Sequence, residues 1–132
     1  LLAVIGSGGT FTGAARYFRQ HHVQCYAVEP EGSVLNGGPA HAHDTEGIGF
    51  EKWPIFLERR LVDGIFTIKD QVAFRNVKSL AINEGLLVGS SSGAALQGGL
   101  TAAALLQKPG HTIKVLEKNE SVKEIGAGIG IG

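Results

Sequence analysis

Short apolar runs alternate along the chain with longer segments in which apolar residues recur at helical spacing. Three of the runs predict buried strands, because they are nearly continuous and end at glycine, proline or a charged residue. They are residues 1–5, 24–29 and 64–69. Weaker runs at 86–88 and 112–116 predict two further short strands. Strands that alternate with helices are typical of α/β proteins, so we predict a parallel sheet with flanking helices.

Four segments between these runs predict helices: residues 10–20, 53–61, 70–83 and 92–106. Pro54 suits the first turn of the second helix, because proline has no N–H to leave unpaired. Asp70 is the expected N-cap of the third helix, and Gly85 its C-cap. The last helix is rich in alanine and leucine, which favour helical backbone.

Composition narrows the class of protein. The chain has 132 residues, enough for one modest domain, and its 12 basic residues balance its 12 acidic ones, so there is no basic stripe for nucleic acid. Its apolar runs fall short of the roughly 18 residues that a membrane span needs. The single cysteine, Cys25, fits a reducing compartment, which predicts a cytoplasmic protein. The sequence has no methionine and opens inside an apolar run, so we expect it to be a fragment.

The loop after the first predicted strand has the composition of a phosphate site. It consists of Gly6, Ser7, Gly8, Gly9 and Thr10, directly before a helix. Glycines let several backbone N–H groups point inward, the helix N-terminus adds partial positive charge, and two hydroxyls add donors. A tight turn that binds nothing remains the alternative interpretation.

A dinucleotide is a second candidate ligand for this loop. Such sites need G-x-G-x-x-G and an acidic residue about 20 positions later. Gly6, Gly8 and Glu29 satisfy part of this pattern, but Phe11 stands where the third glycine belongs. A nucleotide-binding α/β module for NAD or FAD therefore stays open as the alternative function.

Four motifs follow one another along the chain: GSGGTFTG at residues 6–13, EPEGS at 29–33, EGIG at 46–49 and EGLLVGSSSGAAL at 84–96. In order and spacing they resemble the cysteine synthase and cystathionine β-synthase family. The resemblance covers about residues 1–115 and implies part of the large domain of the tryptophan-synthase-β-like fold (fold type II). It further implies pyridoxal 5'-phosphate as cofactor, an amino-acid substrate and a homodimer. The implied reaction is β-replacement, making cysteine or cystathionine from serine or O-acetylserine.

The resemblance also implies roles for particular residues. Residues 6–10 would hold the cofactor phosphate, and Ser91 would hydrogen-bond the pyridine nitrogen. Gly47, Ile48 and Gly49 would line the substrate side of the cofactor, where the two glycines, having no side chain, leave room for the amino acid. Helix capping by the serines and an ordinary flexible loop are the alternatives that the residues alone leave open.

The lysine that carries the cofactor as a Schiff base lies, in this family, in a PxxSxKDR-like segment before the glycine loop. None of the lysines in the present sequence has that context. The resemblance therefore implies no catalytic residue here, and we expect the fragment alone to be inactive.

The end of the sequence departs from the family. Residues 116–132 form a divergent glycine-rich tail, EIGAGIGIG included. From about Gly99 the sequence resembles flavin-dependent aromatic monooxygenases, but Ala94 and Leu96 replace the glycines that a flavin loop requires. An inactive remnant of a fused gene is therefore a third hypothesis.

One histidine-containing segment invites a metal hypothesis. His41 and His43 alternate beside Asp44, as ligands on one side of an extended segment do. No third or fourth ligand accompanies them, so we predict no metal site and two solvated loop histidines.

Overall fold

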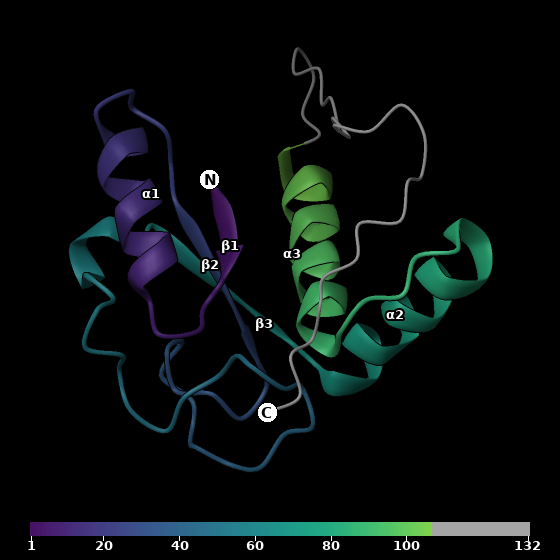
Figure 1. The fold of residues 1–132 in the computed structure, drawn as a ribbon. Coiled ribbons are helices and arrows are strands. Elements are labelled where there is room, and N and C mark those ends of the chain that lie inside the picture. Colours follow the sequence, from purple (N-terminus) through teal and green to yellow (C-terminus); the bar gives the residue numbers. More distant parts are fainter. Residues whose placement is uncertain (107–132) are drawn as a thin grey trace, which may run out of the picture.

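The computed structural model describes residues 1–106, which form a three-stranded parallel sheet between helices (Figure 1). The strands are β1 (Leu2–Val4), β2 (Tyr26–Pro30) and β3 (Gly64–Ile68). The sheet order is β1-β2-β3; Val28 pairs with Val4 on one side and with Phe66 on the other. All three carboxyl ends therefore lie at the same edge. The predicted α/β class with a parallel sheet is confirmed.

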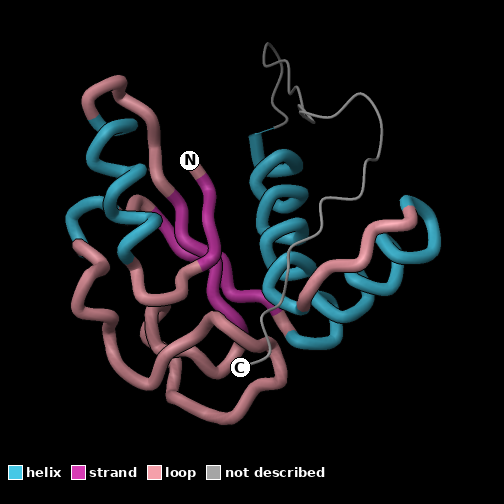
Figure 2. Tube along the Cα trace, in the orientation of Figure 1, coloured by secondary structure: helices cyan, strands magenta, loops and turns pink. Residues whose placement is uncertain are grey.

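Helices cover both faces of the sheet (Figure 2). They are α1 (Gly9–Arg19), α2 (Asp70–Glu84) and α3 (Ser90–Leu106), with a short 3-10 helix η1 (Arg59–Leu61). Neighbouring residues of β2 point to opposite faces: Ala27 packs in the cluster beneath α1, and Val28 in the cluster beneath α3. Helix α2 packs on α3, so the chain forms successive layers of α1, sheet, α3 and α2.

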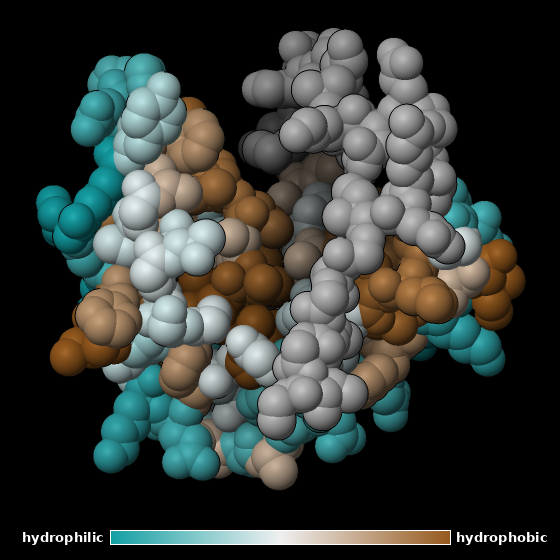
Figure 3. Space-filling model, in the orientation of Figure 1, coloured by the Kyte–Doolittle hydropathy of each residue, from teal (hydrophilic) through white to brown (hydrophobic). Residues whose placement is uncertain are grey.

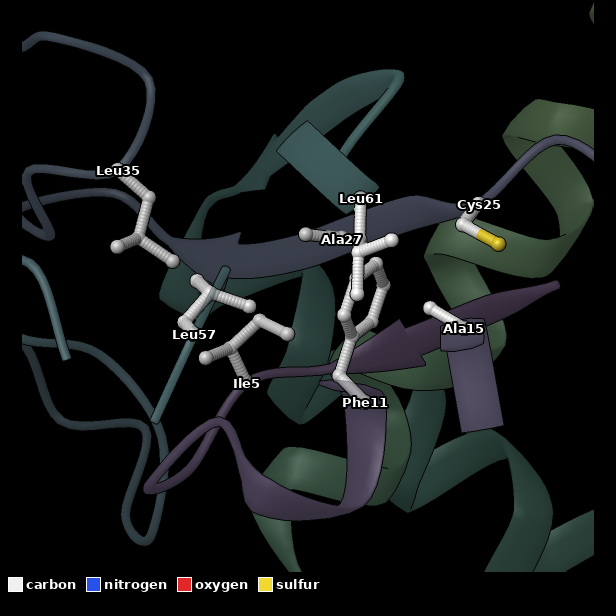
Figure 4. Close-up of a cluster of buried hydrophobic side chains, with 8 residues drawn as sticks. All are labelled: Ile5, Phe11, Ala15, Cys25, Ala27, Leu35, Leu57 and Leu61. Carbon is white, nitrogen blue, oxygen red and sulfur yellow. The ribbon is translucent and has the colours of Figure 1, made fainter. Parts of the chain in front are cut away.

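The main core lies between α1 and the sheet (Figure 4). Phe11 and Ala15 of α1 meet Cys25 and Ala27, all of them at most 2% exposed. Phe11 fills the space in which a dinucleotide-binding fold would need glycine for close helix–strand packing. Cys25 is buried as a small apolar side chain, which is its commonest role.

The predicted helix at 53–61 is wrong except for its last turn, η1. Its backbone groups bond elsewhere: the Thr12 hydroxyl donates to the Phe56 carbonyl at 2.7 Å and accepts from the Glu58 N–H at 3.2 Å. The Trp53 indole donates to the Leu57 carbonyl at 2.6 Å. Contacts with α1, 44 to 46 positions away in sequence, hold this segment in an irregular form.

The predicted strand at 86–88 is also wrong, because this segment links α2 to α3 and does not reach the sheet. Leu87 is 90% exposed there. Other exposed apolar side chains lie on and beside α2, among them Phe74, Ile82 and Leu86. Figure 3 shows hydrophobic surface, in brown, over this part of the molecule.

The ends of α2 bear out one prediction and correct another. Gly85 is the C-cap, with φ +67° in the left-handed region. Lys69, and not Asp70, is the N-cap; Asp70 is the first helical residue and bonds a distant loop instead. Helix α3 begins at Ser90, two residues before the predicted start.

The predicted strand at 112–116 and the tail at 116–132 lie outside the described residues. Within residues 1–106, no helix is long and apolar enough to cross a membrane.

Candidate functional site

Three loops meet at the carboxyl edge of the sheet, the lower edge in Figure 1. They are the glycine loop after β1, the loop at 46–49 between β2 and β3, and the start of α3. Open parallel sheets bind ligands at this edge, because the connecting loops diverge there. The juxtaposition makes this edge the candidate site.

The glycine loop leads directly into α1. Gly8 is the N-cap, with φ +89° and ψ −11°, and no side chain caps the helix. Ser7, Gly9 and Thr10 are exposed beside the uncapped end. The first-turn N–H groups, the partial positive charge of the helix and two exposed hydroxyl-bearing residues therefore lie together at this helix end. This donor set fits a phosphate dianion.

Gly8 is in close contact with a buried leucine behind the loop. A Cβ built on Gly8 would lie 2.8 Å from both the Cβ and the backbone nitrogen of Leu57. Leu57 is held there by the bonds of Thr12 to its two neighbours. The site therefore needs glycine at position 8 both for its positive φ and for this packing.

Ion pairs reinforce the same contact from the surface. Arg16 of α1 bonds the carboxylate of Glu58, which Arg60 also contacts. The hydrogen bond from Arg16 is the main reason that the pKa of Glu58 is lowered; burial opposes it, and Arg60 adds to it. The segment behind Gly8 is thus attached to α1 both by the buried hydrogen bonds of Thr12 and by the surface ion pair of Arg16 with Glu58.

The loop at 46–49 lies beside the glycine loop. The Gly49 N–H donates to the Ile5 carbonyl at 3.4 Å, and a Cβ on Gly6 would lie 3.4 Å from the Gly47 carbonyl oxygen. Ile48 is buried against the second face of the sheet. The predicted substrate-side loop and the predicted phosphate loop are therefore neighbours.

The two glycines of this loop have different surroundings. A Cβ on Gly47 would meet nothing within 4 Å, so open space lies beside it. A Cβ on Gly49 would overlap the His43 imidazole and stand 2.7 Å from Cγ of Pro30. Gly47 thus has the free space expected of a substrate-side residue. At Gly49 the chain itself fills that space, and glycine is required for packing and for its φ of +92°.

The start of α3 joins the same edge through Ser90. Its hydroxyl accepts the Glu46 N–H at 3.0 Å, directly before Gly47. Ser91, the residue predicted to contact the cofactor ring, is the next residue of α3 and is half-buried. The structure therefore places the start of α3, which carries Ser91, beside the loop at 46–49, and that loop beside the glycine loop. Their roles as ligand-binding residues remain predictions.

Sequence analysis did not anticipate the residues that hold this arrangement. The Asp70 carboxylate accepts the N–H of Asp44 at 2.6 Å, and it accepts both the N–H and the hydroxyl of Thr45, at 3.1 and 2.5 Å. The Ser33 hydroxyl accepts the Phe50 N–H at 3.1 Å. Ser33 ends the EPEGS motif, which is the one signal that could have identified it.

The pKa of Asp70 reflects these contacts. Burial raises the pKa of Asp70, but the hydrogen bonds from Asp44 and Thr45, with the charge of His43, outweigh burial and lower it overall. The carboxylate is therefore the form that holds the loop at neutral pH.

Glu29, the acidic residue of the dinucleotide hypothesis, is turned into the protein. It is 1% exposed, and its carboxylate accepts the N–H groups of Leu35 and Asn36 at 2.9 and 3.0 Å. Thr67 donates its hydroxyl at 3.0 Å. A carboxylate occupied in this way is not free to bind a ribose, which disfavours the dinucleotide alternative.

The histidines at 41 and 43 do not converge. His41 is exposed, and its backbone N–H donates to the Gly32 carbonyl. His43 is half-buried, its ring lies against Gly49 and its Nδ1 is buried, so the prediction of a solvated histidine is wrong at position 43. Nowhere in the described part of the chain do three His, Cys, Asp or Glu side chains gather in a way that could hold a metal ion.

Comparison with known proteins identifies the protein family that has this fold and this arrangement of loops. The family described as pyridoxal-phosphate dependent enzyme matches residues 1–117. The chain belongs to this family, and the resemblance drawn from the four motifs is confirmed.

Particular relatives are similar over most of the chain. An O-acetylserine dependent cystathionine beta-synthase of Bacillus subtilis (strain 168) is 51% identical over 104 residues, covering 77% of this chain and 34% of the relative. A cysteine synthase of Helicobacter pylori is 46% identical over 116 residues, covering 86% and 38%. The crystal structure of an O-acetylserine dependent cystathionine beta-synthase from Helicobacter pylori matches with a TM-score of 0.75 and 50% identity, over 80% of this chain and 35% of that one. The chain thus spans little more than a third of their length.

Pyridoxal phosphate is the family's cofactor, and the edge fits part of it. The uncapped N-terminus of α1 with Ser7 and Thr10 fits the phosphate. Gly47 leaves open space beside this loop. The lysines at 52, 69 and 78 are exposed, and none has the sequence context of the family's cofactor lysine.

Proposed function

We propose that this chain supplies the phosphate and ring side of a pyridoxal-phosphate enzyme that makes cysteine or cystathionine from serine or O-acetylserine. The observation that carries the proposal is the meeting of the glycine loop, the loop at 46–49 and the start of α3 at one edge. The names of the relatives support the reaction class, β-replacement on an amino acid.

Each loop has a distinct task in this proposal. When bound, the cofactor withdraws electrons from the amino-acid substrate and so supports replacement of its β-substituent. The first turn of α1, with Ser7 and Thr10, holds the phosphate and orients the ring. Ser91 offers a neutral hydroxyl to the ring nitrogen, and Gly47 leaves space for the substrate.

The proposal also includes the oligomeric state of the full-length enzyme and its cellular compartment. By resemblance the full-length enzyme is a homodimer, and it works in the cytoplasm, where the buried free thiol of Cys25 stays reduced.

The phosphate site can be tested by comparing pyridoxal phosphate with pyridoxal, which lacks the phosphate. We expect the double variant Ser7→Ala, Thr10→Ala to bind pyridoxal phosphate about 10- to 100-fold more weakly, the effect of losing hydrogen bonds to a charged group. Ser79→Ala, an exposed serine of α2 away from the edge, is the matched control. Titration calorimetry measures each affinity. Equal binding of pyridoxal and its phosphate would contradict a phosphate site at this loop. Binding of NAD or FAD that depends on Glu29 would favour the dinucleotide alternative.

We further propose that these 132 residues alone are catalytically silent, because no lysine in them has the context of the cofactor lysine. Incubation with pyridoxal phosphate, borohydride reduction and peptide mapping are expected to label no single lysine stoichiometrically. No cysteine is expected from O-acetylserine and sulfide. One fully labelled lysine would contradict this and would identify the catalytic residue.

A further inference from the structure

The loop that carries Gly47 is anchored on both sides. Before it, Thr45 is 1% exposed and directs both its N–H and its hydroxyl to Asp70. After it, the Gly49 N–H bonds the Ile5 carbonyl at the end of β1. Between these anchors Gly47 is exposed, with φ +77°. Its position beside the glycine loop therefore depends on the two anchors and on the bond from Glu46 to Ser90.

The Asp70 carboxylate is engaged by the loop and not by its own helix. The N-cap position of α2 is Lys69, and no side chain caps the helix there. All three bonds to the carboxylate come from positions 25 or 26 residues earlier in the chain. A negative charge is favourable in the first turn of a helix, so Asp70 is stable at this place while it binds the loop.

The surroundings of the carboxylate contain charges of both signs. A cavity of about 390 Å³ beside it is lined by Glu31, His41, Asp44 and Lys69. The charge of His43 acts on Asp70 from the loop itself. Residues of the loop and residues that follow β3 line this cavity from two sides, and the three bonds to the Asp70 carboxylate join the loop to the start of α2 beside it.

We propose that Asp70 is a positioning residue for the substrate side of the site: it fixes Gly47 beside the glycine loop without touching cofactor or substrate. This inference rests on the proposed function for its meaning, but the anchor itself can be tested without any ligand. Asp70 thus supports binding of the amino acid indirectly, through the position of Gly47, whereas the glycine loop holds the phosphate.

The test compares Asp70→Asn with Asp63→Asn in the full 132-residue chain. Asp63 is a matched control, because its carboxylate also accepts a backbone N–H, that of Cys25 at 2.6 Å; in addition it forms an ion pair with Arg19. In Asp70→Asn the amide hydrogens of Thr45 and Gly49 are expected to exchange at least about 10-fold faster, since their local opening becomes easier. In Asp63→Asn the Cys25 amide is expected to change while the loop does not.

A pH titration gives a second test, because protonation of an aspartate that does not hold this loop would leave the chemical shift of Gly47 unchanged. Because the pKa of Asp70 in the folded chain is lowered, the group is a carboxylate at neutral pH and accepts the bonds from the loop. These bonds are expected to weaken as the pH falls through the folded pKa and the carboxylate is protonated. The ¹⁵N shift of Gly47 is expected to titrate with Asp70 in the unmodified chain and to stay flat in Asp70→Asn.

Pyridoxal phosphate separates failure of this inference from failure of the proposed function. In the unmodified chain the cofactor is expected to move the amide shifts of both Thr10 and Gly47, and in Asp70→Asn only that of Thr10. If Gly47 responds to the cofactor equally in both chains, or if the amides of Thr45 and Gly49 exchange at the same rate in both, Asp70 does not position the loop. If the cofactor moves neither residue in the unmodified chain, the proposed function fails while the ligand-free readouts still decide the role of Asp70.

Discussion

Replacing Gly8 with alanine is expected to lower the free energy of unfolding by about 2–5 kcal/mol and to abolish binding of pyridoxal phosphate. The backbone at Gly8 has φ +89°, where a side chain is strained. The added Cβ would also lie 2.8 Å from backbone and side-chain atoms of Leu57, which cannot move freely because Thr12 bonds the residues on both sides of it.

Gly13→Ala is the matched control for this change. Gly13 lies in the same helix, is exposed, and a Cβ there would meet nothing within 4 Å. Alanine is the better helix former, so this variant is expected to be about 0.5–1 kcal/mol more stable. Urea unfolding measures both variants. A Gly8→Ala chain as stable as Gly13→Ala would show that the turn does not have the conformation described.

Gly93→Ala is expected to destabilise the chain by about 2–4 kcal/mol, because it forces α2 and α3 apart. The new Cβ would overlap the Ala73 carbonyl oxygen and stand 2.9 Å from Cγ2 of Val77. Backbone atoms form most of this contact, so a change of side-chain rotamer cannot relieve it. The same shift would displace Ser91, two residues earlier on α3, and so weaken cofactor binding as well.

Gly99→Ala tests whether the effect comes from helix packing. Gly99 lies in the same helix, is exposed and has open space around it. Its replacement is expected to raise stability slightly, as helix propensity predicts. Thermal midpoints measured for the two variants should therefore move in opposite directions; two equal falls would contradict close packing at Gly93.

Sequence patterns predicted the local elements of this fold better than its long-range bonds. The strands at 26–30 and 64–68 are short apolar runs bounded by glycine, proline or charge, which is a local signal. The helix expected at 53–61 failed because Thr12, far away in sequence, takes up its backbone groups. The periodicity of a segment cannot show that a distant side chain will hydrogen-bond its backbone groups.

The same limit applied to the site. The glycine loop was found because glycines beside a helix start have a meaning of their own. Asp70 was expected to cap α2, since an aspartate at a helix start usually does so. The structure shows instead that the Asp70 carboxylate accepts bonds from Asp44 and Thr45. It also shows that His43 and Pro30 occupy the space next to Gly49. Neither contact can be read from the local sequence.

The most direct test of the account is a titration of the ¹⁵N-labelled chain with pyridoxal phosphate, followed amide by amide. We expect the largest shifts at residues 6–10, with Gly47 and Ser91 responding at the same ligand concentrations, because these segments share one edge of the sheet. Shifts confined to the cavity lined by Glu29, Ser33 and Asn36, or none at residues 6–10, would contradict a phosphate site at the start of α1.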